Sequence, residues 1–514
     1  MIVDATDADR GLFARTFDAC VIGTGPAGIT LARRLAARGL TVALMEGGGL
    51  ELSDESQDLY KGEIVGLEYF PLDEARLRYF GGSSNHWGGR CRALDAVNFL
   101  PMAPNPLSGW PIAKSALDPY AAETDEILDM ISAAEAPDLP FEQKTPRFHR
   151  IQYRYSAPTR FGEKYHDELA ASPEIVCAVN ANLVDLRLDD GLGTVTGAVF
   201  KSFTDGDPGF TVEARVYVLA LGGLETPRAL LNFTSQKPNG IGNDNDRVGR
   251  YFCEHPHFRL GQVYYDQPIP EAQILAAPEE AYAPTDAFLA EHGTLTFSLL
   301  VTPMIEDPLQ LSTELVRSAG CVTSFSEHVL EKVLGHNLDC ERGGLRMYLA
   351  QDGKRHAVQG AVAIHAEQGL HPDSRVRLAD ETDRFGLRRI AFDWRLTELD
   401  FHTMETAIAE LGAHYAEQGT GRVQIFDWLT ADPVDVPGLG QGSRVGGHHH
   451  MCATRMSANP REGVVDADCK VHGVANLYIG GSSAFATAGY ANPTYTIVQL
   501  ALRLGDHLTE TLKA

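Results

Sequence analysis

The sequence predicts an α/β protein, α+β overall, in which a parallel-sheet domain carries an inserted domain built on a mostly antiparallel sheet flanked by helices. Apolar runs that end in glycine, each followed by residues with helical spacing, lie near the start, in the middle and near the end of the chain. The chain between residues 258 and 436 differs. Its short apolar or alternating runs are rich in β-branched and aromatic residues, which is typical of antiparallel strands.

The first of these patterns lies at residues 17–45. An apolar run at 17–23 ends in glycine, residues 24–39 are rich in Ala and Leu at helical spacing, and residues 41–45 form a second apolar run. Strand, helix and strand within about 30 residues are typical of a Rossmann-type fold. We therefore expect the parallel sheet to begin here.

Later segments extend this sheet and separate the inserted domain from it. Residues 215–219 form a strand candidate followed by a helical pattern, and residues 477–512 repeat that arrangement. Residues 396–418 have the spacing of an amphipathic helix. We predict a discontinuous nucleotide-binding domain of residues 1–100, 171–257 and 437–514, and a substrate-binding or cap domain of residues 101–170 and 258–436.

Composition excludes several classes of protein. The 514 residues carry a formal net charge of −25, which repels phosphate backbones and anionic membrane surfaces, so we expect no nucleic-acid partner. No apolar run approaches the about 20 residues of a membrane helix, and the first residues lack a secretory pattern. We expect no membrane span and a cytoplasmic location. The eight cysteines include no CxxC pair and are interpreted as small buried residues.

Gly23, Gly25 and Gly28 form a GxGxxG motif between the first strand and its helix. Gly23 permits a tight turn, Gly25 lets backbone amides approach a pyrophosphate, and Gly28 lets the helix pack closely on the sheet. Glu46 ends the second strand, where an acidic side chain accepts hydrogen bonds from ribose hydroxyls. The pattern predicts a dinucleotide site and does not by itself distinguish NAD from FAD.

Residues 79–89, YFGGSSNHWGG, form a glycine-rich loop that contains a histidine and a tryptophan. Such a loop is too apolar and too bulky for a plain surface linker. One interpretation is a buried turn whose glycines meet a tight geometry. The other is a loop whose backbone lies against a flat ring system.

Three adjacent histidines, His448, His449 and His450, form a further motif together with Asn492 in the sequence GYANPT. Neighbouring residues of an extended chain point to opposite faces, so three in a row do not converge on one ion. No carboxylate or cysteine pattern completes a shell, and we predict no metal site. A general base with a hydrogen-bonding partner is the favoured interpretation.

Several long motifs follow one another along nearly the whole chain. They include VIGTGPAGITLARRLAARGLTVALMEGG, RYFGGSSNHWGG, LALGGLETPRALL, VGRYFCEHP, HHMCATRM and GYANPTYTIVQLALRL. In this order they resemble the glucose-methanol-choline (GMC) flavin oxidoreductases, and the loop and the ending most resemble the pyranose and glycoside oxidising branch. The resemblance implies an FAD-dependent oxidoreductase that acts on CH–OH groups.

By this resemblance the cofactor is FAD, and its contacts are spread over the chain. In some sugar-oxidising relatives the histidine that matches His86 is joined covalently to the flavin, and in others it is not, so both forms stay open. The ADP half of FAD would be held by Gly23, Gly25, Gly28 and Glu46, and its adenine would contact Val184. The isoalloxazine would lie along Gly81, Gly82, Asn85 and His86, with Asn492 and Pro493 at the reactive side of the ring. The pyrophosphate or ribityl chain would lie near Gly481 and Ser482.

The family's catalytic pair is a histidine and a second histidine or asparagine. By its distance from Arg455, His449 matches the catalytic histidine and Asn492 its partner, with His448 and His450 as alternatives. The resemblance implies that His449 accepts the hydroxyl proton while the carbon gives a hydride to flavin N5. Asn492 would hydrogen-bond the same hydroxyl and orient the carbon.

The implied substrate is a small-molecule alcohol, in the first place a sugar or glycoside whose secondary ring hydroxyl becomes a ketone. The alternatives are a dehydrogenase of a non-sugar alcohol and a GMC-fold lyase with structural FAD. Oxygen or a quinone-like carrier would accept the electrons, so oxidase and dehydrogenase both stay open. His255 is interpreted either as a pocket residue or as a structural histidine that caps a turn.

Overall fold

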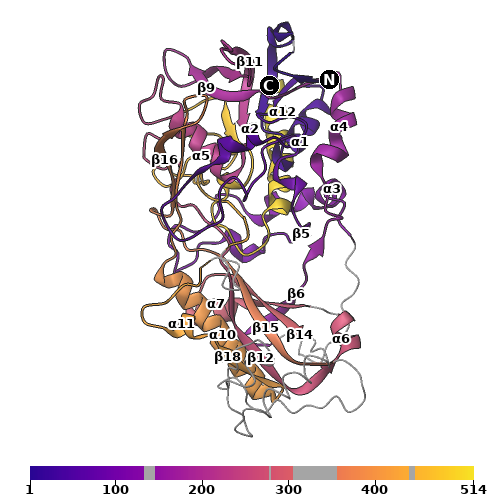
Figure 1. Ribbon diagram of the computed structural model, residues 1–514, viewed down its shortest axis with the longest axis vertical. Coiled ribbons are helices and arrows are strands. Elements are labelled where there is room, and N and C mark those ends of the chain that lie inside the picture. The colour runs from indigo at the N-terminus through magenta and orange to yellow at the C-terminus, as the bar shows by residue number, and fades with distance from the viewer. Residues whose placement is uncertain (8, 132–144, 277–278, 305–355, 439–445) are drawn as a thin grey trace, which may run out of the picture.

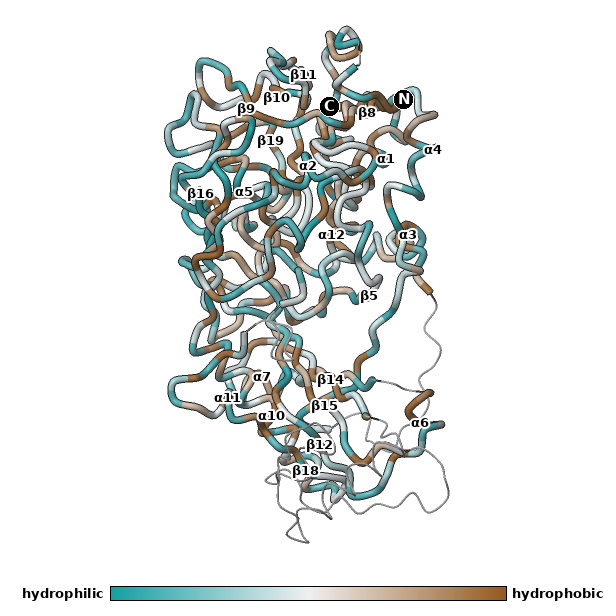
Figure 2. The backbone as a smooth tube through the Cα atoms, in the orientation of Figure 1, coloured by the Kyte–Doolittle hydropathy of each residue, from teal (hydrophilic) through white to brown (hydrophobic). Residues whose placement is uncertain are grey.

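The computed structural model describes residues 1–7, 9–131, 145–276, 279–304, 356–438 and 446–514. The molecule is elongated, with two large sheets placed one after the other along its long axis (Figure 1). Both termini lie at the end formed by the first sheet (Figure 1). In the outer loops near β9 and β16 hydrophilic residues predominate (Figure 2).

The first sheet has the strand order β1-β8-β3-β2-β11-β10-β9, with β19 paired to β11. Strands β1, β8, β3, β2, β11 and β19 run parallel, and β9 and β10 extend the sheet in antiparallel fashion. The predicted parallel sheet built from distant chain segments is confirmed. Its strands are β1 (Ile2–Asp4), β2 (Thr16–Ile22), β3 (Val42–Met45), β8 (Ile175–Val179), β9 (Asn182–Leu188), β10 (Val195–Lys201), β11 (Phe210–Leu219) and β19 (Leu477–Ile479).

Small residues let the helices of this part approach closely. A Cβ atom on Gly28 would lie 1.9 Å from the carbonyl oxygen of Gly23, which brings the start of α1 against the strand. A Cβ on Gly505 would lie 2.6 Å from Cγ of Arg34, so α12 packs directly on α1. The helices are α1 (Pro26–Ala36), α2 (Asp54–Gln57), α3 (Ala121–Ile127), α4 (Phe161–Ala171), α5 (Gly222–Asn232) and α12 (Thr494–Lys513).

The second sheet is antiparallel throughout, with the order β18-β12-β15-β14-β13-β6. It confirms the predicted inserted sheet and carries most of its strands from residues 257–425. Its strands are β6 (Phe148–Ile151), β12 (His257–Pro270), β13 (Glu280–Pro284), β14 (Phe297–Met304), β15 (His356–Ala366) and β18 (Gly421–Ile425), and nearby are α6 (Glu271–Ala276), α7 (Asp286–His292) and α11 (Asp427–Thr430).

Helix α10 (Glu398–Gln418) packs across β12, β15 and β18, as its amphipathic pattern predicts. It begins at a capping box formed by Thr397 and Asp400 and ends at Gly419, whose φ of 66° is left-handed. The buried side chains recur every three or four residues and therefore form one stripe that faces the sheet. They include Met404, Ala407, Ile408, Leu411 and Tyr415.

Two smaller sheets complete the fold. Strands β16 (Arg375–Thr382), β17 (Arg388–Asp393) and β4 (Gly62–Ile64) form one, and β5 (Arg90–Cys91) with β7 (Arg154–Tyr155) forms the other.

The structure places most of the described part of residues 101–170 with the first sheet, which differs from the predicted boundary. Leu117 and Phe161 belong to the core of that sheet, α3 packs on α12, and α4 packs on α1. In this stretch β6 is the strand that joins the second sheet. Both short helices bury their apolar faces on helices of the parallel sheet, a pairing that sequence spacing does not encode. The rest of the domain assignment stays a prediction.

The structure can be compared with what the sequence predicts for the cysteines and for membrane-spanning helices. Six cysteines lie among the described residues, and all six are buried and free, whereas Cys321 and Cys340 lie outside that part of the chain. Within the described ranges, none of the helices combines the length and the apolar character needed to cross a bilayer.

Arg228 of α5 forms a buried ion network with the β16–β17 turn. Its guanidinium donates to Asp383 Oδ2 (2.6 Å), to Glu225 Oε1 (2.5 Å) and to the carbonyl oxygen of Arg388 (2.8 Å). Because Arg228→Met leaves the buried Asp383 carboxylate without its cation, we expect the free energy of unfolding to fall by about 3 kcal/mol or more. Urea titration of the purified variant measures this change.

Arg38→Met is the matched control. Arg38 is a surface residue whose Nη2 lies 3.6 Å from Asp506 Oδ1, so its loss should cost less than about 1 kcal/mol. Equal losses of stability in the two variants would contradict the importance of the buried network.

Candidate active site

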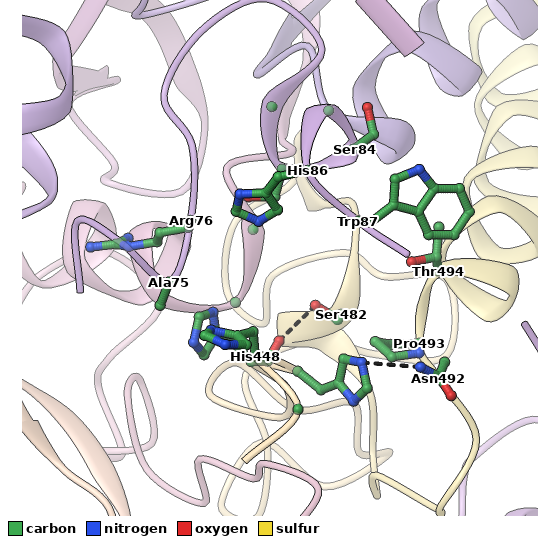
Figure 3. Close-up of a pocket in the computed structure, with 18 of the residues that line it drawn as sticks. Ala75, Arg76, Ser84, His86, Trp87, His448, Ser482, Asn492, Pro493 and Thr494 are labelled. Atoms are coloured by element: carbon green, nitrogen blue, oxygen red, sulfur yellow. Dashed lines mark hydrogen bonds between the residues drawn. The ribbon is translucent and has the colours of Figure 1, made fainter. Parts of the chain in front are cut away.

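A cavity of about 1020 Å³ lies where the carboxyl ends of the parallel strands meet the second sheet. Residues of the β2–α1 turn, the end of β3, the glycine-rich loop and strands β12, β14 and β15 all line it. The histidines 448–450 and residues 492–494 line it as well, and Figure 3 shows His448 and residues 492–494 around it. In open α/β sheets, this edge is where ligands bind.

The β2–α1 turn leaves the helix N-terminus open to the cavity. Gly23 has a φ of 110°, and a Cβ there would lie 2.4 Å from the carbonyl oxygen of Ala220. Gly25 is the N-cap of α1 and makes no side-chain capping bond, and a Cβ added to it would meet nothing within 4 Å. The N-terminus of α1 therefore borders open space, which suits an anion.

Glu46 is held in place beside this turn. Its Oε2 accepts hydrogen bonds from Thr24 N–H (3.0 Å) and Thr24 Oγ1 (2.6 Å), and its Oε1 accepts one from Gly48 N–H (2.8 Å). The side chain is 7% exposed, and that surface lines the cavity. A helix N-terminus next to a fixed carboxylate fits the pyrophosphate and ribose of a dinucleotide.

The glycine-rich loop lies against the same turn. Gly82 and His86 line the cavity, and a Cβ on Gly82 would lie 3.3 Å from Cα of Gly25. Gly81 and Asn85 do not line it. Instead, Gly81 N–H donates to Thr24 Oγ1 (3.2 Å) and Asn85 Nδ2 donates to the carbonyl oxygen of Phe80 (2.9 Å), and both bonds hold the loop. Burial and the Arg160 guanidinium lower the pKa of His86.

The remaining predicted cofactor residues divide into two groups. Gly481, Ser482 and Pro493 line the cavity, and Ser482 Oγ donates to the carbonyl oxygen of His450 (2.7 Å; Figure 3). Gly28 supports the helix behind the turn and does not line the cavity. Val184 does not line it either. Its neighbours Ala181 and Leu183 line an adjoining cavity of about 30 Å³ together with Gly47 and Arg78, which the sequence motifs did not single out.

The three adjacent histidines point in different directions. His448 is exposed and stacks on Phe70, with ring centroids 4.1 Å apart. His450 is buried, with Nε2 3.0 Å from the hydroxyl of Tyr69. His449 is the one whose Nε2 lies 3.3 Å from Asn492 Nδ2 (Figure 3). Of the three candidate registers, the geometry brings His449 and Asn492 together.

Two buried residues that the sequence did not single out hold this segment. Glu254 accepts hydrogen bonds from the backbone N–H groups of His255 (2.8 Å), His449 (2.8 Å) and Gly447 (3.2 Å), and from the hydroxyl of Tyr69. Burial raises the pKa of Glu254 to about 7. Glu254 belongs to the motif VGRYFCEHP, but nothing in that motif indicated contacts with a segment nearly 200 residues later.

His255 lies next to the candidate base. Its Nδ1 is 2.9 Å from Nδ1 of His449. Burial, followed by the neighbouring rings of His255, His257, His450 and His448, keeps the pKa of His449 well below 6.5. The His449 imidazole is therefore neutral at pH 7.

A metal ion is sterically conceivable at one place in the described residues. His255, His257 and His449 each place one ring nitrogen within 4.8 Å of the others. The close contact between His255 and His449 is a hydrogen bond between ring nitrogens. The expected absence of a metal thus stays a prediction.

Comparisons with known proteins identify sequences that this chain resembles. Residues 371–501 match the family model described as GMC oxidoreductase. The chain is 24% identical to 6'''-hydroxyparomomycin C oxidase of Streptomyces lividus, covering 98% of this chain and 94% of that one. It is also 24% identical to 2-methyl-1,2-propanediol dehydrogenase of Mycolicibacterium austroafricanum, covering 96% and 95%.

The fold has solved counterparts. An FAD-dependent oxidoreductase from Chaetomium thermophilum superimposes with a TM-score of 0.58 at 15% identity, covering 97% of this chain and all of that one. At this identity the likeness concerns the fold alone. The family model matches residues 371–501, and the two full-length relatives are named an oxidase and a dehydrogenase, so this chain is similar to the GMC oxidoreductases, which act on alcohols.

Proposed function

We propose that this protein oxidises a secondary ring hydroxyl of a sugar or glycoside to a ketone, with His449 as the general base and Asn492 as its partner. The observation that carries the proposal is the His449–Asn492 pair, which faces the cavity with a neutral imidazole. A neutral imidazole can accept the hydroxyl proton directly.

The residues present fit FAD. The open N-terminus of α1 at Gly25 would hold the pyrophosphate, and Glu46 would accept hydrogen bonds from the ribose. His86 lines the cavity and is the position at which a covalent bond to FAD would form. Acid precipitation of the protein separates the two forms, because only covalently attached flavin stays with the precipitated chain. When bound, FAD supplies the acceptor for the hydride that leaves the substrate carbon.

Asn492 has a second function in this arrangement. Its Oδ1 is buried and has no hydrogen-bond partner among the described residues, although buried polar atoms are generally paired. The hydroxyl to be oxidised would donate its one proton to His449 Nε2, and a second hydroxyl of the substrate would donate to Asn492 Oδ1 and satisfy this oxygen. The pair thus orients the hydroxyl and places its proton beside His449 Nε2.

Two observations support a polyhydroxylated substrate. The part of the cavity lined by the second sheet presents the polar side chains of Arg259, Glu279 and His365 next to the apolar Leu300 and Ile364. The full-length relative from Streptomyces lividus is an oxidase named for an aminoglycoside. The second candidate, a small non-sugar diol, rests on the similarity to the propanediol dehydrogenase.

Replacement of the proposed base tests this function. We expect His449→Ala to retain FAD but to slow its reduction by substrate at least about 100-fold, because the variant lacks the proposed base. Stopped-flow absorbance without oxygen measures this rate. His448→Ala removes the neighbouring exposed ring, and we expect it to slow the reaction less than about tenfold. Reduction of His449→Ala at the wild-type rate would refute the assignment.

The pH dependence follows from the lowered pKa of His449. A general base is active when unprotonated, and protonation sets in only as the pH falls through its pKa. Because burial and the neighbouring imidazoles hold that pKa well below 6.5, we expect kcat/KM to be constant from neutral pH down to pH 6.5. A decline centred at or above pH 6.5 would show that the base is a group with an ordinary or raised pKa.

Cofactor affinity tests the nucleotide end of the cavity. Glu46→Ala removes a carboxylate acceptor worth about 1.5–3 kcal/mol, so FAD should bind roughly 10–100-fold more weakly. Titration of the apoprotein with FAD, followed by flavin fluorescence, gives the dissociation constant. The control is Glu213→Ala, which removes an exposed acid of β11 and should leave the affinity unchanged. Unchanged FAD affinity in Glu46→Ala would place the ribose elsewhere.

A further inference from the structure

We infer that His255 is a positioning residue that fixes the tautomer of His449, so that the proton of His449 sits on Nδ1 and its Nε2 faces Asn492 as a free base. The inference rests on the proposed function, since it assigns His255 a purpose only if His449 is the base. His255 itself does not line the cavity, and its described hydrogen bonds go to His449 and to the carbonyl oxygen of Ala488, not to Asn492.

The first step concerns the proton of His255. Its side chain is fully buried, and its Nε2 lies 3.3 Å from the carbonyl oxygen of Ala488. A carbonyl oxygen only accepts, so Nε2 carries the proton. Burial lowers the pKa of His255 to about 4, which keeps the ring neutral with a single N–H. Its Nδ1 is therefore an acceptor.

The second step assigns the proton of His449. The Nδ1 atoms of the two rings are 2.9 Å apart, and the acceptor on His255 requires a donor on His449. The proton of the neutral His449 ring is thus on Nδ1, and Nε2 keeps its lone pair. The other tautomer would set two lone pairs against each other at this distance.

The third step places Asn492. Nδ2 of Asn492 lies 3.3 Å from His449 Nε2, where an N–H can donate to the lone pair. With Nδ2 as the donor to His449, Asn492 Oδ1 is the buried acceptor that has no hydrogen-bond partner among the described residues. One assignment of donors and acceptors therefore satisfies the whole chain from the Ala488 carbonyl through His255 and His449 to Asn492, whose backbone belongs to the same segment as Ala488.

The backbone keeps the two imidazoles in register. Cys253 and Met451 form an antiparallel bridge, with N–H to O distances of 3.1 and 3.0 Å in the two directions. Glu254 then accepts the N–H groups of both His255 and His449. The ring contact is thus built on a rigid pairing of the two segments, as a positioning role requires.

Ring-nitrogen NMR of the holoenzyme tests the tautomer directly. In protein labelled with ¹⁵N in its histidine rings, the His449 resonances are assigned by their loss in His449→Ala. We expect wild-type His449 to show the pattern of a neutral ring protonated at Nδ1. His255→Leu should convert His449 to the form protonated at Nε2, and His255→Asn, whose Oδ1 can accept in place of Nδ1, should keep the wild-type pattern. A wild-type His449 protonated at Nε2 would overturn the inference.

Kinetics of the same variants supply the second readout. We expect His255→Leu to lower the rate of flavin reduction at saturating substrate by about 100-fold with little change in KM, since a wrong tautomer impairs the base and not binding. His255→Asn should recover most of that rate. Equal rates in His255→Leu and wild type would also overturn the inference. Because the NMR of the wild type needs no variant at position 255, a misfolded His255→Leu leaves the inference testable.

The two proposals fail in different ways. If His449→Ala reacts as fast as the wild type, the proposed function is wrong whatever the tautomer. If His449→Ala is slow but wild-type His449 is protonated at Nε2, the base is right and the role of His255 is wrong.

Discussion

One buried carboxylate holds the site together. Glu254 is inaccessible to solvent and accepts hydrogen bonds from the backbone of the histidine segment and from Tyr69, residues that lie 185 to 195 positions away along the chain. A buried carboxylate without such donors would be costly, and burial already raises its pKa to about 7. The same interaction therefore stabilises the carboxylate and fixes the backbone that carries His449.

The two halves of the cavity use different physics. The β2–α1 turn depends on backbone contacts. Gly23 lies against the backbone of Ala220 and Gly28 lies against the backbone of Gly23, and a side chain at either glycine would prevent this close approach. The histidine end depends on side chains. Burial lowers the pKa of His255 and of His449, so both imidazoles are neutral and can form a hydrogen bond with each other. Strand β19 ends and helix α12 begins on either side of residues 480–493, and the two ends of this segment, residues 480–482 and 492–493, line the cavity.

The sequence predicted those parts of the molecule that depend on local patterns. The β-α-β unit, the antiparallel sheet and helix α10 follow from periodicity, and the spacing of one motif predicted that Gly23, Gly25 and Glu46 lie together, at the edge of the cavity. For the three adjacent histidines the resemblance favoured His449 and kept His448 and His450 as alternatives, and the tertiary contact with Asn492 distinguishes His449 from its neighbours.

The features that the sequence did not predict depend on contacts between segments that lie far apart along the chain. Tyr69 and Glu254 form a hydrogen bond across 185 residues, and neither lies in a glycine-rich motif. The helices within residues 101–170 are short and pack on whichever surface the tertiary fold presents, which proved to be that of the parallel sheet. The predicted contact of Val184 with the adenine stays a prediction; its neighbour Leu183 lines the adjoining cavity.

The central proposal is that this chain transfers a hydride to bound FAD from the carbon that bears a sugar hydroxyl. The most direct measurement is the absorbance spectrum of the holoenzyme without oxygen, recorded before and after adding free sugars, glycosides, simple diols and other alcohols one at a time. Bleaching of the flavin band by a sugar or glycoside, with the matching keto product in stoichiometric amount, is the predicted result. A flavin that stays oxidised while a sugar is converted would contradict the claim and indicate lyase chemistry, and bleaching by the non-sugar alcohols alone would assign the substrate to that class.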